Sequence, residues 1–198
     1  FRSLKLARDF RQRHPAVPLI LMGYYNPIYI YGNNQFIADA VAAGVDGLIL
    51  VDLPPEEDAE LCVPAKQAGL DFIRLITPTS DDIRLPAILA EASGFVYYVS
   101  VTGITGTASA AADSIAAAET RIRKQTDLPI VTGFGIRTPE QAADAASLSN
   151  GAVVGSAVVN IIADNLQEDP TTISADHRQK IIRKIAAFVA DLSAAIRG

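Results

Sequence analysis

Short runs of apolar residues recur at regular intervals along the chain and are separated by more polar segments. Each run is continuous rather than alternating with polar positions, which is typical of a strand buried on both faces, as in a parallel sheet. The pattern therefore predicts six strands, within residues 17–24, 46–53, 70–77, 94–100, 128–135 and 151–156.

The segments between these runs carry helix signals. Asn33 and Asn34 are expected to cap a helix that ends at Gly44. Thr138, followed by Pro139, is expected to cap another helix. Strands that alternate with helices indicate βα units with right-handed crossovers. Helices are predicted over residues 1–14, 33–44, 54–69, 108–118, 138–151 and 175–198, and the last of these is expected to be a barrel helix rather than a membrane or partner helix.

Glycines after the last two predicted strands decide between an open, doubly wound sheet and a barrel. A dinucleotide-binding sheet carries G-x-G-x-x-G after its first strand, and no such motif occurs here. Residues 132–135 (TGFG) and 154–157 (VGSA) instead lead into helix starts, where (β/α)8 barrels bind phosphate after strands 7 and 8. We therefore predict one domain over residues 1–198, a partial TIM barrel of about six βα units and a C-terminal helix, whose N-terminal βα units are missing from this sequence.

Gly155 and Ser156 interrupt the apolar run Ala152 to Val159. A glycine lets backbone N–H groups approach an anion closely, a serine hydroxyl can donate to it, and a helix N-terminus attracts negative charge. The pair therefore predicts a phosphate site. An alternative stays open at this point, in which Gly155 and Ser156 only let the helix pack tightly on the barrel.

Composition and charge narrow the class of protein. The 198 residues carry a formal net charge of −5, with Lys and Arg scattered along the chain, which disfavours nucleic acid as a partner. No apolar run reaches the roughly 20 residues of a membrane-spanning helix. Cys62 is the single cysteine, so we expect no disulfide, no metal site and a reducing cytoplasmic location.

Five motifs, in this order, resemble the tryptophan synthase alpha subunit family: LMGYYNPIYIYG (21–32), DGLILVDLPPEE (46–57), SVTGITG (100–106), GFGIRTPEQ (133–141) and GSAVV (155–159). The resemblance runs through nearly the whole chain. It implies a TIM barrel that cleaves indole-3-glycerol phosphate, a small phosphorylated substrate, to indole and glyceraldehyde 3-phosphate. It further implies an α2β2 complex with a beta subunit that carries pyridoxal phosphate, and no cofactor in this chain.

The resemblance also implies site residues, by motif. Tyr97 would lie beside the reacting glycerol chain as the catalytic candidate, although its phenol could equally be satisfied by a neighbour inside the barrel. The other implied sets are the phosphate site (Gly106, Phe134, Gly135, Gly155, Ser156), the indole pocket (Met22, Ile49, Val51, Ile76, Phe134, Val153), the lid loop (Gly103, Thr105, Gly106) and the partner interface (Asn26, Pro27, Asp52, Pro54).

Two departures from the family pattern limit what this sequence is expected to do. The family's two catalytic acids belong to its second strand and the following loop, and neither is in these residues, so we expect this chain alone to be inactive. Val101 stands where some members carry an arginine. Asp52 is expected to cap a helix that starts at Pro54 or Pro55 rather than to act in catalysis.

Two other functions stay open. Another phosphate-binding barrel enzyme, of aromatic or thiamine biosynthesis, could share GFGI and GSA, and a non-catalytic barrel could regulate a partner. The motif VDLPPEE (51–57) argues against the first of these. The turn signal in YYNP (24–27) fits a partner-facing loop or an ordinary turn.

Overall fold

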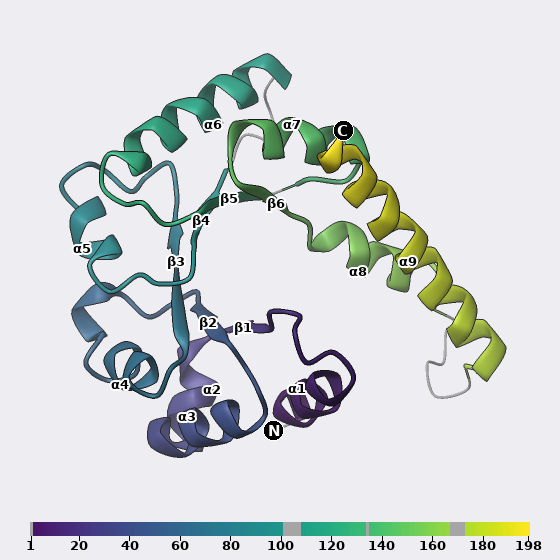
Figure 1. The fold of residues 1–198 in the computed structure, drawn as a ribbon, viewed down its shortest axis with the longest axis horizontal. Helices are drawn as coiled ribbons and strands as arrows, with labels where there is room; N and C mark the ends of the chain where they lie inside the picture. The colour runs from purple at the N-terminus through teal and green to yellow at the C-terminus, as the bar shows by residue number, and fades with distance from the viewer. Residues whose placement is uncertain (1, 101–107, 134, 167–172) are drawn as a thin grey trace. The chain divides into compact units, whose positions relative to one another are not determined.

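Among the described residues, six strands alternate with helices, and neighbouring strands follow chain order from β1 to β6 (Figure 1). The computed structural model describes residues 2–100, 108–133, 135–166 and 173–198. The strands are β1 (Ile20–Gly23), β2 (Gly47–Leu50), β3 (Asp71–Ile76), β4 (Val96–Val99), β5 (Ile130–Gly133) and β6 (Gly151–Val153). Each lies inside one of the six predicted runs, so the strand predictions are confirmed.

Helices fill the intervals between the strands. They are α1 (Arg2–Arg13), α2 (Tyr25–Tyr31), α3 (Asn33–Ala42), the 3-10 helix η1 (Pro55–Glu57), α4 (Cys62–Gln67), α5 (Leu85–Leu89), α6 (Ala108–Arg123), α7 (Pro139–Leu148), α8 (Ser156–Ala163) and α9 (Ala175–Arg197). Thr138 accepts the Gln141 N–H at 3.3 Å, which confirms the predicted cap of α7. The chain divides into two units, Phe1–Tyr97 with Lys124–Pro129 and Tyr98–Arg123 with Ile130–Gly198.

The first unit is built on three parallel strands whose two faces differ. Met22 pairs with Ile49 in register, and Ile49 pairs with Ile73. Because side chains alternate along a strand, Leu48, Leu50 and Phe72 point to the opposite face. There they form the core with residues of α1, α3 and α4: Leu4, Ala7, Phe36, Ile37, Ala40, Cys62 and Ala65. The helices of this unit thus cover one face of the sheet, and the row through Ile49 lies on the other.

The second unit contains the parallel pair β5 and β6, with Gly133 opposite Val153 at their carboxyl ends. Helix α7 packs on both strands and on α9, and α9 also contacts α8. Ile136, Ala142, Ala145 and Leu192 form the buried cluster between these elements, with Phe188 of α9 packed against it. The long C-terminal helix therefore has one face in the core, as its apolar spacing predicts.

The predicted helix over 54–69 is wrong, because the segment forms η1 and α4 with a break between them. Pro64 has no N–H for the Glu60 carbonyl, and its ring would clash with that carbonyl in a continuous helix. The Glu60 carbonyl instead accepts a hydrogen bond from Asn33 Nδ2 at 2.9 Å. A new helix starts at Cys62, which leaves Pro64 in its first turn, where proline is tolerated.

Two further predictions about the segment after β1 are wrong. Residues 24–27 were expected to form a loop, but Asn26 and Pro27 lie in the first turn of α2. The Asn pair was expected to cap the next helix, yet the residue at its N-cap is Gly32, with a φ of 97°, and no side chain caps it. The amide of Asn33 is used elsewhere, since its Nδ2 also donates to the Tyr25 hydroxyl at 2.8 Å.

Candidate functional site

The start of α8 is the feature of the second unit that matches the predicted phosphate site. Gly155 is the N-cap residue and Ser156 the first residue of the helix, and both are exposed. Gly155 has a φ of −117°, outside the left-handed region that favours glycine. A Cβ added at Gly155 would meet no described atom within 4 Å. Neither backbone strain nor close packing therefore explains this glycine, which argues against the tight-packing alternative.

The starts of α7 and α9 in the same unit are capped by side chains. The Thr138 hydroxyl accepts an N–H at the start of α7, and the Ser174 hydroxyl accepts the His177 N–H at 3.1 Å at the start of α9. Within the described residues, no side chain caps α8. Because the first N–H groups of a helix have no acceptor within the helix, an uncapped and exposed start offers its donors to an anion.

The remaining predicted phosphate residues are only partly described. Gly135 follows β5 and has a φ of 73°, a conformation that glycine adopts without strain. Gly106 and Phe134 lie outside the described residues, as does the whole predicted lid loop with Gly103 and Thr105. These residues stay predictions.

Three of the residues predicted for the indole pocket share one face of the first unit. Met22 is 60% exposed, and Ile49, its partner in register, is 7% exposed. Val51 lies two positions beyond Ile49, on the same face by alternation, and its N–H donates to the Gly23 carbonyl at 3.1 Å. The three form an apolar row at the carboxyl ends of β1 and β2, on the face away from the helices.

The other pocket residues and the catalytic candidate lie at different strand ends. Ile76 is fully buried at the last position of β3. Val153 is half-buried at the last position of β6, in the second unit. Tyr97 is half-buried in β4, and burial raises the pKa of its phenol, so Tyr97 is protonated at neutral pH. A protonated phenol can donate a hydrogen bond to a substrate oxygen.

The predicted partner residues lie in the first turn of α2 and in the loop after β2. Asn26, Pro27, Asp52 and Pro54 are all exposed. The Asp52 carboxylate accepts the Tyr25 N–H at 2.7 Å, and in the part of the chain that the structure describes no side chain caps η1. The expectation that Asp52 caps a helix at Pro54 or Pro55 is therefore wrong, because its carboxylate turns to the first N–H of α2 instead.

Tyr25 connects this surface to α3 and to the segment before α4, a role that the sequence did not indicate. Its hydroxyl donates to the Glu60 carboxylate and accepts from Asn33 Nδ2. Burial, together with the hydrogen bond to Glu60, raises the pKa of Tyr25. Asp52 and Glu60 lie 27 and 35 residues after Tyr25 in the chain, so no local sequence signal indicates these contacts.

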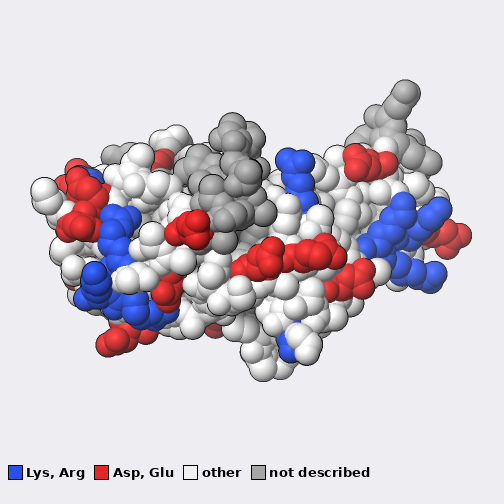
Figure 2. Space-filling model, turned by 90° about the horizontal axis from the view of Figure 1, so that it is seen from above, with Lys and Arg blue, Asp and Glu red and all other residues white. Residues whose placement is uncertain are grey.

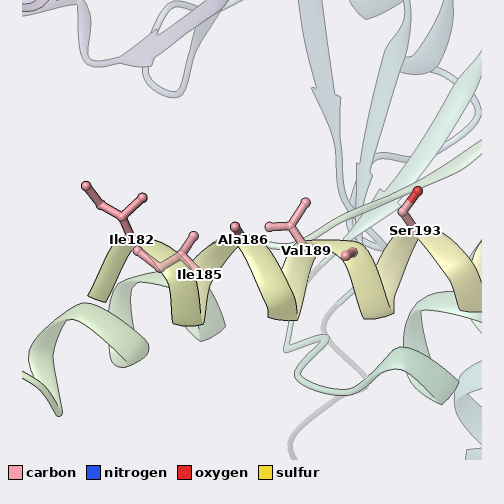
Figure 3. Close-up of a pocket in the computed structure, with 6 residues that line it drawn as sticks. Ile182, Ile185, Ala186, Val189 and Ser193 are labelled. Carbon is pink, nitrogen blue, oxygen red and sulfur yellow. The ribbon is translucent and has the colours of Figure 1, made fainter. Parts of the chain in front are cut away.

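A groove along α9 is lined by residues that were not predicted for any site. Figure 3 shows Ile182, Ile185, Ala186, Val189 and Ser193 along the same side of the helix, and Ala190 completes the lining.

No helix among the described residues is long and apolar enough to cross a membrane. No group of three His, Cys, Asp or Glu in the described part of the chain could hold a metal ion. On the face shown in Figure 2, Lys and Arg lie in separate groups with acidic groups between them.

Strands joined by helices, with parallel pairing in β1–β3 and in β5–β6, define the class as an α/β protein built from βα units. The family model for the tryptophan synthase alpha chain matches residues 1–192, and the chain belongs to that family. This finding supports the main functional interpretation over the two alternatives.

Solved structures agree with this assignment. The alpha subunit of tryptophan synthase from Legionella pneumophila is 35% identical and superposes with a TM-score of 0.82, over 98% of this chain and 68% of that chain. The alpha subunit from Pyrococcus furiosus is 33% identical, with a TM-score of 0.78, over 97% and 72%. A chain of the P. furiosus α2β2 complex is 32% identical, with a TM-score of 0.78 over the same shares. The match confirms the TIM-barrel fold class.

Proposed function

We propose that the complete protein cleaves indole-3-glycerol phosphate to indole and glyceraldehyde 3-phosphate. The reaction is a retro-aldol cleavage, in which the bond between indole C3 and the glycerol chain breaks. A general acid protonates C3 and a general base removes a proton from the glycerol hydroxyl or the ring nitrogen. The resemblance implies that the acids for these steps belong to family segments that residues 1–198 do not contain, so the proposal concerns a protein that includes those segments.

The open start of α8 is the observation that carries this proposal. Its exposed N–H groups and the Ser156 hydroxyl would bind the phosphate of the substrate, with Gly155 leaving room for the phosphate oxygens. Gly106, Phe134 and Gly135 are the further proposed phosphate residues, and Gly103 and Thr105 belong to the proposed lid. A phosphate held here would anchor the substrate at one end.

The apolar row of Met22, Ile49 and Val51 supports a binding place for the flat indole ring. Apolar side chains with a few polar groups suit an aromatic ligand. The resemblance implies Ile76, Val153 and Phe134 as further residues for the indole, and these three stay predictions. Tyr97 would donate its phenolic hydrogen to an oxygen of the glycerol chain, because a tyrosine phenol is protonated at neutral pH and burial raises the pKa of Tyr97 further.

A beta subunit with pyridoxal phosphate is the proposed partner, and the cytoplasm is the proposed location. The P. furiosus relative is described as an α2β2 complex whose subunits activate each other. We place the contact on the docking surface, defined as α2 together with residues 52–58. Tyr24, Tyr29 and Ile30 are large apolar residues exposed in or beside α2, and such exposure marks interaction sites.

The direct test is an assay of indole release from indole-3-glycerol phosphate by the full-length protein, with and without the beta subunit. We expect release in both cases and a faster rate in the complex. Inorganic phosphate should compete with the substrate, because it would occupy the α8 start. A full-length protein that releases no indole even with the beta subunit contradicts the proposed function.

A further inference from the structure

Arg74 lies in β3, within the apolar run that predicted this strand, and its side chain is only 5% exposed. It shares the helix-facing side of the sheet with Phe72, and its guanidinium carbon lies 4.7 Å from the centre of that ring. An arginine is rarely buried this deeply unless it is paired. The groups that Arg74 contacts therefore explain why an arginine stands in this buried strand.

Both partners of the guanidinium belong to the loop after β2. Nη1 donates to the Leu53 carbonyl at 3.3 Å, and Nη2 forms a buried ion pair with Asp58. The two contacts hold both ends of the segment that contains Pro54 and η1. The same segment continues from Asp52, whose carboxylate accepts the Tyr25 N–H at the start of α2.

Stability alone does not account for this ion pair. Arg74 Nε is buried and has no hydrogen-bond partner in the described part of the chain. Removing two charges from water is costly, and an apolar pair of similar volume is often as stable as a buried ion pair. What the guanidinium supplies, and an apolar side chain would not, is a fixed direction for the Leu53 carbonyl and the Asp58 carboxylate.

We infer that Arg74 is a positioning residue for the docking surface. It orients residues 53–58 directly, and it orients the start of α2 through Asp52. The partner contact rests on the proposed function, whereas the orientation of the loop does not. The inference therefore has one consequence in the isolated protein and another in the complex.

The first test is hydrogen exchange of backbone amides in the full-length protein with Arg74→Met. Methionine fills a similar volume without the charge but leaves Asp58 without its ion-pair partner, so some acceleration throughout the protein is expected. We expect the Tyr25 amide to accelerate about tenfold more than the Leu48 amide of β2. Arg84→Met is the matched control, because Arg84 also pairs with this loop, at Glu56, but through an exposed contact. Exposed pairs contribute little, so this control should keep the wild-type rate at Tyr25.

Arg74→Lys distinguishes the positioning of residues 53–58 from the mere presence of a buried positive charge opposite Asp58. Lysine keeps the charge opposite Asp58 but lacks the planar fork that also reaches Leu53, so we expect part of the Tyr25 protection to return. A wild-type exchange rate at Tyr25 in Arg74→Met overturns the inference. Equal acceleration at Tyr25 and Leu48 also overturns it, because Arg74 would then only stabilise the fold.

The second test is the affinity of the Arg74→Met protein for the beta subunit. We expect a loss of about tenfold, because the docking surface must then be ordered on binding. Unchanged affinity despite faster exchange at Tyr25 overturns the role in docking. If the wild-type protein does not bind the beta subunit, the proposed partner is wrong, and the exchange experiment still decides whether Arg74 positions the loop.

Discussion

Two regions of the molecule differ in how their polar groups are hydrogen-bonded. One comprises the loops after β1 and β2, and the other is the loop after β6. After β1 and β2, the first N–H of α2 is bound by Asp52, and the Leu53 carbonyl and Asp58 carboxylate are bound by Arg74. After β6, no side chain among the described residues caps the start of α8, and no described atom lies beside its glycine. Groups satisfied within the chain give a surface of fixed shape, which suits a protein partner. Unsatisfied donors in an open position suit a small anion.

Gly155→Asp should have the largest effect, because it places a negative charge where the phosphate is proposed to bind. We expect phosphate affinity to fall about a hundredfold, or ~3 kcal/mol, a size typical of charged hydrogen-bonding groups. Folding should be unaffected or stabilised by about 0.5–1 kcal/mol, since aspartate is a favourable N-cap residue. Calorimetric titration with phosphate and urea unfolding measure the two effects.

Gly155→Asn is the matched control for charge at this position, because its side chain has the same size and is neutral. It should lose about tenfold in affinity or less, through crowding alone. Equal losses in the two variants would mean that charge plays no part at this helix start.

Asp52→Ala tests the loops after β1 and β2, where polar groups are hydrogen-bonded within the chain. Removing the carboxylate leaves the Tyr25 N–H without its acceptor, so the free energy of unfolding should fall by about 1–2 kcal/mol. Asp52→Asn should restore most of it, since an amide oxygen also accepts. Urea unfolding provides the values, and phosphate affinity should stay at its wild-type level in both variants. A changed phosphate affinity would mean that the two regions do not act separately.

Thr138→Ala and Ser156→Ala compare two hydroxyls at helix starts in the same unit. Thr138 caps α7, so its loss should lower the free energy of unfolding by about 1 kcal/mol and leave phosphate affinity unchanged. Ser156 caps nothing, so its loss should leave stability unchanged and weaken phosphate binding about fivefold. The same urea and calorimetric measurements apply, and equal behaviour of the two variants would remove the distinction.

Cys62 is expected to change stability only at alkaline pH, and it reports on the core of the first unit. Burial raises the pKa of the Cys62 thiol to about 11 from a model-compound value of 9.0. The thiol's contribution to stability is present below about pH 9 and is lost as pH rises through about 11. Wild type should therefore lose stability relative to Cys62→Ala over this range, as measured by urea unfolding at several pH values. A constant difference would contradict the raised pKa.

The strands and most helices could be predicted because their signals are local. Six continuous apolar runs mark the strands, and Thr138 with Pro139 marks the start of α7. The break between η1 and α4 could also have been predicted from Pro64, whose missing N–H interrupts a helix pattern. In YYNP, however, the proline was interpreted as a turn signal although it lies in the first turn of a helix.

The connections of the candidate site could not be predicted, because they join residues far apart in the chain. Arg74 sits inside an apolar run, and its partner Asp58 is 16 residues away. Asp52 was expected to serve the nearest helix but serves α2, 27 residues earlier. Gly155 and Ser156 are a different case. Their break in the apolar run is a local signal, but it fits both a phosphate site and tight packing of the helix. Only the open space around Gly155 favours one of them.

Hydrogen exchange at the start of α8 tests the central claim most directly, in the full-length protein with and without saturating phosphate. The Gly155 and Ser156 amides should exchange fast in the free protein and become protected when phosphate binds. The His177 amide, held by Ser174 at the start of α9, should be protected in both conditions and serves as the internal reference. Unchanged exchange at Gly155 and Ser156 in saturating phosphate would contradict the account.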